Sequence, residues 1–249
     1  MPPIDGGDRV VSRAGTDVKA TTSPYPRLQI RVARDAPVAV IAYTERRRYH
    51  HLMAWRFSSD GVTHGSRFRG NLRLQDVAPD GRWYSYMAEG GDAEHGGQAW
   101  SAVAQVPEAQ AAAFWPTISP WPISVWWLGA DLVAVVGVGL ELRQPRIDPA
   151  FSDRFHICDD PSLSQRLPGP PKGVSEVQLS AWRSRFTPSV PGGDWEVPAA
   201  DAAAGPDGTI FATFGSVVRQ FSVDAEGAMR LVLERDFAPE IQIERDGSG

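Results

Sequence analysis

The sequence has a single cysteine, Cys158, so no disulfide can form within the chain, and nothing indicates an oxidising compartment. It also lacks a continuous apolar run of membrane-spanning length. The longest apolar stretch, SVWWLGADLVAVVGVGLEL, is interrupted by Asp131 and by three glycines. Residues 1–26 contain no apolar core of the kind that a signal peptide needs. These absences predict a cytoplasmic protein with no membrane span.

Lysine is nearly absent. Lys19 and Lys172 are the only two lysines among 25 basic residues, so arginine supplies almost all of the positive charge. With 24 glycines and 21 prolines, this composition is typical of a GC-rich bacterial genome. The net charge is −5 and the isoelectric point is near 5.6. No nucleic-acid partner is expected, because nucleic acids usually bind a basic face.

The short motifs that mark a catalytic nucleophile or a phosphate-binding loop are also missing. The sequence has no GxSxG motif, no Cys–His pair of a known type and no glycine-rich phosphate loop. Gly137-Val138-Gly139 lies in an expected strand pair with no helix after it, so it is not a dinucleotide fingerprint. We therefore predict no cofactor.

The five histidines do not have the spacing of a metal site. His50 and His51 are adjacent, so in a strand their side chains point to opposite faces. The stretch HICDD, which begins at His156, brings nitrogen, sulfur and oxygen ligands close together, but no second half follows at zinc-site spacing. No metal site is predicted.

What the sequence does have is a succession of short strand patterns. Hydrophobic residues make up 42% and charged residues 22%, as in an ordinary globular protein. We expect a tail at 1–26 and one β domain at 27–245, with a long proline-rich loop at about 145–173 and one short helix at 107–113. Apolar alternation or apolar runs predict strands, which include 27–33, 37–43, 51–57, 62–68, 82–86, 99–106, 126–128, 132–138, 155–157, 174–179, 182–186 and 210–214.

One stretch recurs. In DVAPDGRWYSYMAEG (76–90), the Pro79-Asp80-Gly81 turn and the aromatic strand after it match Pro206-Asp207-Gly208 and IFATF, and an aspartate precedes each turn, Asp76 and Asp201. Asp207 lies 127 residues after Asp80, about three units of 42 residues, roughly the length of a four-stranded propeller blade. The turn sets hairpin register and is expected to carry no chemistry itself.

This recurrence predicts an all-β protein with a small, five-bladed β-propeller-like fold, complete or degenerate. A β-sandwich or an irregular β-meander would give a similar series of short strands and stays open as an alternative.

Several segments carry a resemblance. They are RVARDAPVAVIAYTERRRYHHLMAWRF, HGSRFRG, APDGRWYSYMA, AWSAVAQVP and the step Phe114-Trp115-Pro116. Through them, residues 27–145 resemble a family of uncharacterised bacterial β-rich proteins. The sequence departs from that pattern after the AWSA strand, where it has QVPEAQAAAF and then TISPWPISVWW. The resemblance implies a β-rich bacterial protein and brings no activity or catalytic residue.

Three kinds of function fit these patterns. The first is a non-catalytic binding or interaction module, such as a bacterial accessory or immunity-type protein, whose small-molecule or protein partner is unknown. The nine tryptophans are expected mainly in the core. The candidate binding residues are Arg46, Arg47 and Arg48 at a hairpin tip, and Trp100 and Trp121.

The second is a hydrolase on a propeller-like scaffold. Its candidate catalytic residues are Asp76, Asp92, His95, His156 and Asp159, of which at least three would have to converge in one pocket. The third is a structural subunit of a larger assembly, which predicts a large exposed apolar patch. The loops at 88–98 and 145–173 are the expected places for function.

Overall fold

A computed structural model describes residues 28–46, 49–90, 99–116, 123–136, 145–158, 201–225 and 228–241. The predicted tail at 1–26 and the predicted strands at 174–179 and 182–186 lie outside these ranges. The described elements are β1 (Leu28–Val32), β2 (Val38–Arg46), β3 (Tyr49–Arg56), β4 (Gly61–Arg69), β5 (Asn71–Val77), β6 (Trp83–Glu89), β7 (Ala99–Gln105), β8 (Ala111–Pro116), β9 (Ser124–Trp127), β10 (Leu132–Val136), β11 (Arg146–Ile147), α1 (Pro149–Arg154), β12 (His156–Cys158), β13 (Asp201–Ala204), the 3-10 helix η3 (Pro206–Gly208), β14 (Ile210–Phe214), β15 (Val217–Val223) and β16 (Met229–Asp236).

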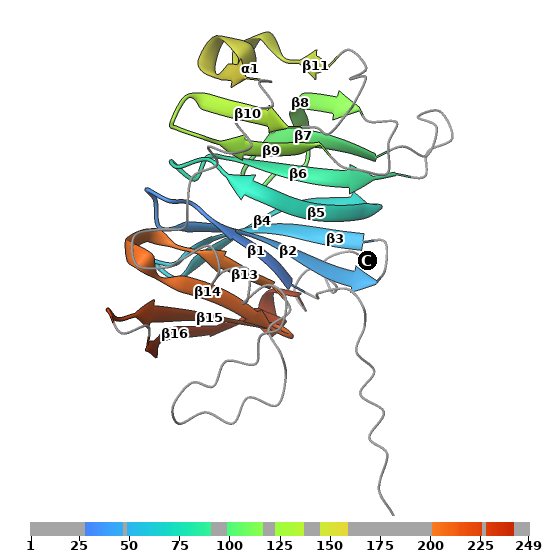
Figure 1. Cartoon of the computed structure of the whole chain (residues 1–249). Coiled ribbons are helices and arrows are strands. Elements are labelled where there is room, and N and C mark those ends of the chain that lie inside the picture. The colour runs from blue at the N-terminus through green and yellow to red at the C-terminus, as the bar shows by residue number, and fades with distance from the viewer. Residues whose placement is uncertain are drawn as a thin grey trace, which may run out of the picture.

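The strands form four sheets. Sheet A has the order β1-β2-β3-β4, sheet B β11-β8-β7-β6-β5, sheet C β12-β10-β9 and sheet D β13-β14-β15-β16. In Figure 1 sheet D lies below sheet A and sheet B above it, and the strands of sheet C overlap those of sheet B. All neighbouring strands are antiparallel except the parallel pair β10 and β12. The all-β prediction is confirmed. The sheets of the described part close no ring, so five blades stay a prediction.

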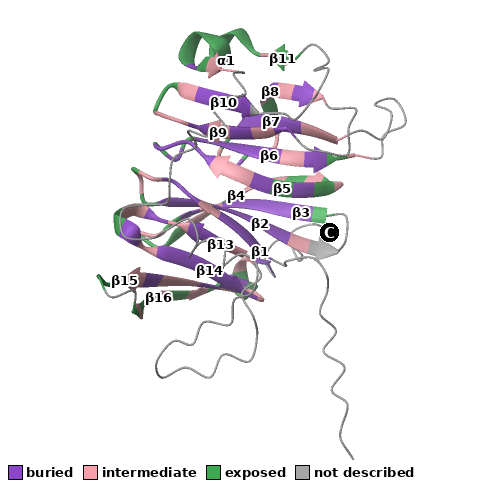
Figure 2. Ribbon diagram, viewed as in Figure 1, coloured by how far each residue is buried: buried purple, intermediate pink, exposed green. Residues whose placement is uncertain are grey.

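Three hydrophobic clusters join the sheets in the order D, A, B, C. Strand β2 explains why the run PVAVIAY is apolar throughout: Ala39 and Ile41 belong to the cluster between sheets A and D, whereas Val40 and Ala42 belong to the cluster between sheets A and B. A strand covered on both faces needs apolar residues at every position. Figure 2 shows the buried residues concentrated in such middle strands.

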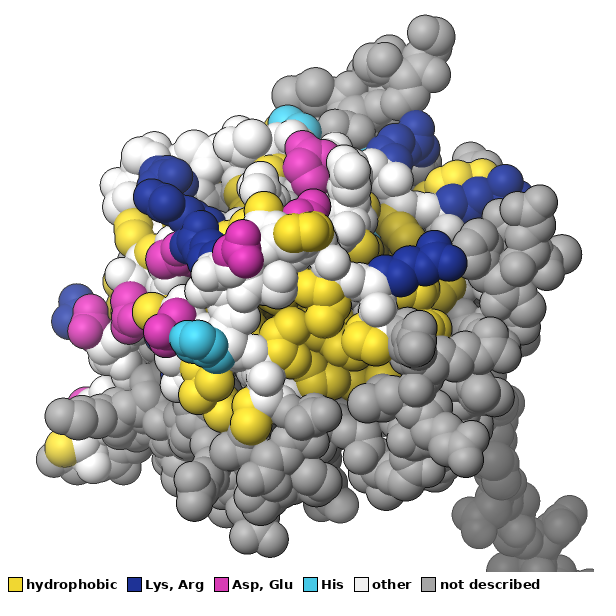
Figure 3. All heavy atoms as spheres, turned by 90° about the horizontal axis from the view of Figure 1, so that it is seen from above, with side chains coloured by type: hydrophobic (Ala, Val, Ile, Leu, Met, Phe, Trp, Pro, Cys, Tyr) yellow, Lys and Arg dark blue, Asp and Glu magenta, His cyan; other side chains and the backbone are white. Residues whose placement is uncertain are grey.

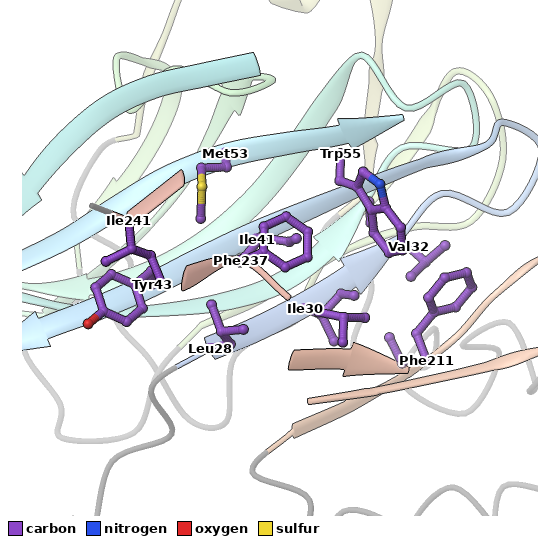
Figure 4. Packing of buried hydrophobic residues seen from close by; sticks show 13 residues of the cluster. Leu28, Ile30, Val32, Ile41, Tyr43, Met53, Trp55, Phe211, Phe237 and Ile241 are labelled. Carbon is purple, nitrogen blue, oxygen red and sulfur yellow. The ribbon is translucent and has the colours of Figure 1, made fainter. Parts of the chain in front are cut away.

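Aromatic side chains fill the space between sheets A and D. Trp55 of β3 packs edge-on against Phe211 of β14 and against Phe237, with ring centroids 6.1 and 5.5 Å apart (Figure 4). Trp55, Phe211 and Phe237 are fully buried. Edge-to-face contacts of this kind add to the free energy gained from burying the ring area. The expectation that tryptophan serves the core therefore holds for this residue.

Sheets B and C meet in a third cluster. It contains Trp83, Trp115 and Trp127 together with Phe151 of α1 and Phe155. The loop predicted at 145–173 thus contributes to the core at its start. Asp148 caps α1 by accepting a hydrogen bond from the N–H of Ala150 at 2.8 Å, and Pro149 takes the first helical position.

The helix predicted at 107–113 is wrong. Residues 107–110 form the turn after β7, and the following residues form strand β8, which pairs with β7. The alanine-rich run has a high intrinsic helix propensity, but Ala113 and Trp115 are buried on one face of sheet B. Burial of alternate residues against a neighbouring sheet outweighs that propensity.

The glycines of the two Pro-Asp-Gly turns have the expected backbone conformation. Gly81 and Gly208 have φ values of +72° and +73°, in the left-handed region that favours glycine. The carboxylate of Asp80 accepts a hydrogen bond from the N–H of Arg82 at 3.0 Å, as expected for an aspartate in such a turn. Asp207 differs, because its own φ is +57°.

Candidate functional site

Strand β5, at one edge of sheet B, carries the first of the predicted catalytic residues, Asp76, and the structure shows what its carboxylate binds. One oxygen, Oδ1, accepts a hydrogen bond from the N–H of Val77 at 2.9 Å. The other, Oδ2, accepts one from the N–H of Trp127 in β9 of sheet C, also at 2.9 Å. Both oxygens therefore bind backbone, and one of them joins sheet B to sheet C.

A hydroxyl group completes this connection. The Oγ of Ser85 in β6 accepts a hydrogen bond from the N–H of Asp76 at 3.0 Å and donates one to the carbonyl oxygen of Val125 in β9 at 2.7 Å. The carboxylate and the hydroxyl thus bind the N–H of residue 127 and the carbonyl of residue 125 in the neighbouring sheet. We call this arrangement the Asp76 latch.

The same arrangement recurs between sheets D and A. Oδ1 of Asp201 accepts a hydrogen bond from the N–H of Ala202 at 2.9 Å, and Oδ2 accepts one from the N–H of Ile30 at 3.0 Å. The hydroxyl of Thr213 accepts from the N–H of Asp201 at 2.9 Å and donates to the carbonyl of Leu28 at 3.1 Å. We call this the Asp201 latch.

The spacing of the two aspartates from their turns now has an explanation. Asp76 lies three residues before Pro79, and Asp201 lies five residues before Pro206. The difference is two residues, and side chains in a strand return to the same face every second residue. Both carboxylates therefore reach the neighbouring sheet although the second aspartate lies two residues farther from its turn.

Two glutamines make a simpler connection of the same kind. Gln29 of β1 donates to the carbonyl of Leu72 at 2.8 Å and accepts from the N–H of Leu74 at 2.9 Å, joining sheet A to sheet B. Gln75 of β5 donates to the carbonyl of Ile123 at 2.7 Å and accepts from the N–H of Val125 at 3.2 Å, joining sheet B to sheet C. Each side-chain amide thus binds the carbonyl of one residue and the N–H of the residue two positions later in the neighbouring sheet.

The two latches differ in the charge beside the carboxylate. Nη1 of Arg31 in β1 donates to Oδ2 of Asp201 at 2.7 Å, and each of the two side chains is 14% exposed. Asp76 has no such ion pair in the part of the chain that the structure describes. Burial raises the pKa of Asp76 to about 6, although the two N–H donors and the more distant guanidinium groups of Arg34 and Arg31 lower it in part.

Buried His50 lies at the connection between sheets A and B. Its Nε2 accepts a hydrogen bond from the N–H of Leu72 at 3.2 Å, and its Nδ1 lies 3.1 Å from the hydroxyl of Thr44. Burial lowers the pKa of His50 to about 4. The neutral ring fits this place because a protonated Nε2 could not accept the N–H of Leu72.

The predicted catalytic residues do not all lie in the described part of the chain. Asp92, His95 and Asp159 lie outside it. His156 is exposed on β12, and the structure shows no contact between it and the carboxylate of Asp76, which binds backbone groups. Across the described ranges, no group of three or more His, Cys, Asp or Glu side chains could hold a metal ion. The hydrolase hypothesis stays a prediction.

The predicted binding residues are distributed in a similar way. Trp100 is half-buried and packs against Phe68 and Phe114, with ring centroids 6.3 and 5.8 Å apart, so its ring serves the core at the side of sheet B. Arg46 is the last residue of β2. Trp121, Arg47 and Arg48 lie outside the described residues.

Sequence reasoning missed most of the groups that join the sheets. These are Gln29, Arg31, Arg34, Gln75, Ser85 and Thr213. A signal was present in Gln29 and Gln75, because each is an uncharged polar residue inside a strand and directly follows a leucine that is buried. A buried polar side chain must find a hydrogen-bond partner, but a sequence does not say in which sheet that partner lies.

Exposed apolar side chains are few. Among the described residues, the exposed large hydrophobic side chains are Tyr49, Leu231 and Val232, at 37%, 40% and 56%. Figure 3 shows hydrophobic atoms gathered at the centre of the upper face, with charged side chains around them. The described residues contain no helix with the length and hydropathy to cross a bilayer.

No protein-family model matches the sequence, and neither a curated protein nor a solved structure matches it. The fold and the contacts of the side chains are therefore the basis for any functional proposal.

Proposed function

We propose that the chain is a non-catalytic binding module that holds an acidic protein partner at one corner of sheet A. The main support is the way in which the interior polar groups are used. The carboxylates of Asp76 and Asp201 and the hydroxyls of Ser85 and Thr213 all bind backbone groups of a neighbouring sheet. Groups that hold the scaffold together are not free to act on a substrate.

The proposed binding surface is the arginine corner, which consists of Tyr49, Arg67 and Arg69. Tyr49 at the start of β3 is directly opposite Arg69 in β4, and residues opposite one another in an antiparallel pair share a face. The guanidinium of Arg67 lies over the ring of Tyr49, 5.9 Å from its centroid. On the other side, Arg46 of β2 is in register with Tyr49.

The composition of this corner favours an acidic protein partner. Tyrosine and arginine are the side chains that most often supply binding energy at protein interfaces. Tyr49 is 37% exposed, and both Arg67 and Arg69 are exposed. In the sequence, Arg46 is followed directly by Arg47 and Arg48, so basic residues are concentrated here although the net charge of the chain is −5. A positive patch on an acidic protein selects partners by electrostatic complementarity.

We also propose that the four sheets are blades of a propeller-like scaffold. In support, sheets D, A, B and C are joined in that order through their first strands, β13, β1, β5 and β9. The connections are the Asp201 latch, the amide of Gln29 and the Asp76 latch. A fifth blade would have to come from outside the described part of the chain, where 42 residues separate β12 from β13.

Binding of a fluorescent poly-glutamate peptide tests the proposed surface. We expect saturable binding that weakens as salt is added, because the Debye length falls from about 30 Å at 0.01 M to about 8 Å at 0.15 M ionic strength. The Arg67→Glu/Arg69→Glu double variant should lose the binding. Arg230→Glu and Arg82→Glu, which reverse exposed charges on other elements, should keep it.

The proposal is wrong if the wild-type protein does not bind the peptide at low salt. It is also wrong if reversing the charges of the arginine corner weakens binding no more than reversing Arg230 and Arg82.

A further inference from the structure

Arg34 lies where the edge strands β1, β5 and β9 of sheets A, B and C come close together. It follows β1, in the loop that leads to β2, and its Nη2 donates a hydrogen bond to the carbonyl of Trp127 at the end of β9 at 2.7 Å. The side chain thus reaches from sheet A to sheet C. The N–H of the same residue, Trp127, binds the carboxylate of Asp76 in sheet B.

The charge of Arg34 has no direct counterion in the described part of the chain. Both oxygens of Asp76 bind backbone N–H groups, and Asp201 is paired with Arg31 at 2.7 Å. The exposed carboxylate of Asp35 is next in the sequence, and no ion pair joins it to Arg34. A partly buried guanidinium without a carboxylate is uncommon, because buried charges are normally paired.

The guanidinium also keeps most of its hydrogen-bonding capacity. It has five N–H donors, and the bond to Trp127 uses one of them. Whichever hydrogen of Nη2 makes that bond, one edge of the guanidinium keeps two parallel donors. That is the arrangement that binds a carboxylate or phosphate group through two oxygens.

We propose that Arg34 is a binding site for a small oxyanion, the carboxylate or phosphate group of a ligand, held beside Asp76 at the ends of β1, β5 and β9. This goes beyond the proposed partner binding. Arg34 and the arginine corner lie at opposite ends of β2, whose nine residues separate them. Either proposal can fail without the other.

The neighbouring charges set the sign of two effects. Arg31 and Arg34 are positive, and Asp201 and ionised Asp76 are negative, with Asp35 exposed nearby. Ionised Asp76 repels an anion at Arg34, so removing its charge should tighten binding. Replacing Arg34 by glutamine removes the attraction and should release the anion. A purely structural role for Arg34 predicts neither effect.

The experiment titrates sulfate into the folded protein and follows the backbone amide signals of residues near Trp127 by NMR. We expect saturable shifts in the wild type, a dissociation constant at least about tenfold weaker in Arg34→Gln and an intermediate one in Arg34→Lys. Asp76→Asn should bind several-fold more tightly. The control Arg82→Gln should bind sulfate as the wild type does, because Arg82 follows the Pro79-Asp80-Gly81 turn and its side chain is 75% exposed.

Acetate and methyl phosphate, titrated in the same way, distinguish the two sources of the oxyanion, and the tighter binder identifies the class. The proposal is overturned if none of the three anions binds saturably to the wild type. It is equally overturned if Arg34→Gln and Arg34→Lys bind sulfate as tightly as the wild type does. Arg34→Lys keeps the test valid should Arg34→Gln fail to fold.

Discussion

The Asp76 and Asp201 latches use the same hydrogen bonds at two sheet interfaces, but only Asp201 is bonded to an arginine. In each latch the carboxylate accepts a hydrogen bond from a backbone N–H of the neighbouring sheet. The hydroxyl donates one to the carbonyl of the residue two positions before that N–H. Arg31 lies 2.7 Å from Asp201, whereas Asp76 relies on two N–H donors and on more distant arginines. The hydrogen bonds of the latch therefore recur at both sheet interfaces, whereas the ion pair with an arginine occurs at only one of them.

The largest loss of unfolding free energy is expected from breaking the ion pair between Asp201 and Arg31. Asp201→Ala removes the acceptor for the N–H of Ile30 and leaves Arg31, 14% exposed, without its carboxylate. Losing one partner of a largely buried pair costs about 3 kcal/mol or more. Urea denaturation should show this loss. Arg31→Met, which removes the other charge of the pair, should leave Asp201 unpaired and give a loss of similar size. A loss below about 1 kcal/mol in Asp201→Ala would mean that the pair adds nothing to the latch.

The next effect depends on pH. The pKa of Asp76 is raised from 3.8 to about 6, so the folded state holds the proton more tightly than the unfolded chain does. The contribution of Asp76 to the free energy of unfolding should therefore fall as the pH rises through this window, by about 3 kcal/mol in all. Asp76→Asn removes this contribution, so urea denaturation at several pH values should show a free energy of unfolding that rises between about pH 4 and 6, where the opposite contribution of His50 remains. An unchanged pH profile would contradict the assignment.

His50 should act with the opposite sign. Its pKa is lowered from 6.5 to about 4, so the unfolded chain binds the proton more tightly, and the free energy of unfolding should fall as the pH drops through this window. The two contributions are of similar size, about 3 kcal/mol, and oppose each other between about pH 4 and 6. In His50→Gln, the free energy of unfolding should fall with rising pH because only the Asp76 contribution remains. In the double variant with Asp76→Asn, it should not change between about pH 4 and 6. Two single variants with slopes of the same sign would refute this account.

The hydroxyl groups offer a matched pair of smaller changes. Ser85→Ala and Thr213→Val each remove the donor to a buried carbonyl and the acceptor of an aspartate N–H. Leaving such groups without a partner costs about 1–3 kcal/mol. Because the hydroxyls make the same bonds, the two variants should lose equal amounts of unfolding free energy, within about 0.5 kcal/mol. A large inequality would show that the latches are alike in geometry only.

The smallest effect is expected at the turn beside the Asp76 latch. Arg82 is 75% exposed and lies 4.0 Å from Asp80, so Arg82→Ala should change the unfolding free energy by less than about 0.5 kcal/mol. Thermal denaturation measures this change. A loss as large as that of Ser85→Ala would mean that the turn, and not the latch, fixes the position of the sheet.

The sequence predicted the all-β class, most strand positions and the recurrence of the Pro-Asp-Gly turn, because these depend on local periodicity and backbone preference. It misplaced the helix at 107–113, where burial of Ala113 and Trp115 overrides helix propensity. It identified Asp76 and noted Asp201 before the second turn, but could not show that they bind Trp127 and Ile30, since those partners lie in other sheets.

The most direct test of the latch is a titration of the Asp76 carboxyl group, followed by carbon-detected NMR together with the amide signal of Trp127. The structure predicts a midpoint near pH 6 for Asp76 and a shift of the Trp127 amide with the same midpoint, because that N–H is bonded to the carboxylate at 2.9 Å. A midpoint near the ordinary value of 3.8, or a Trp127 amide that does not respond, would contradict it.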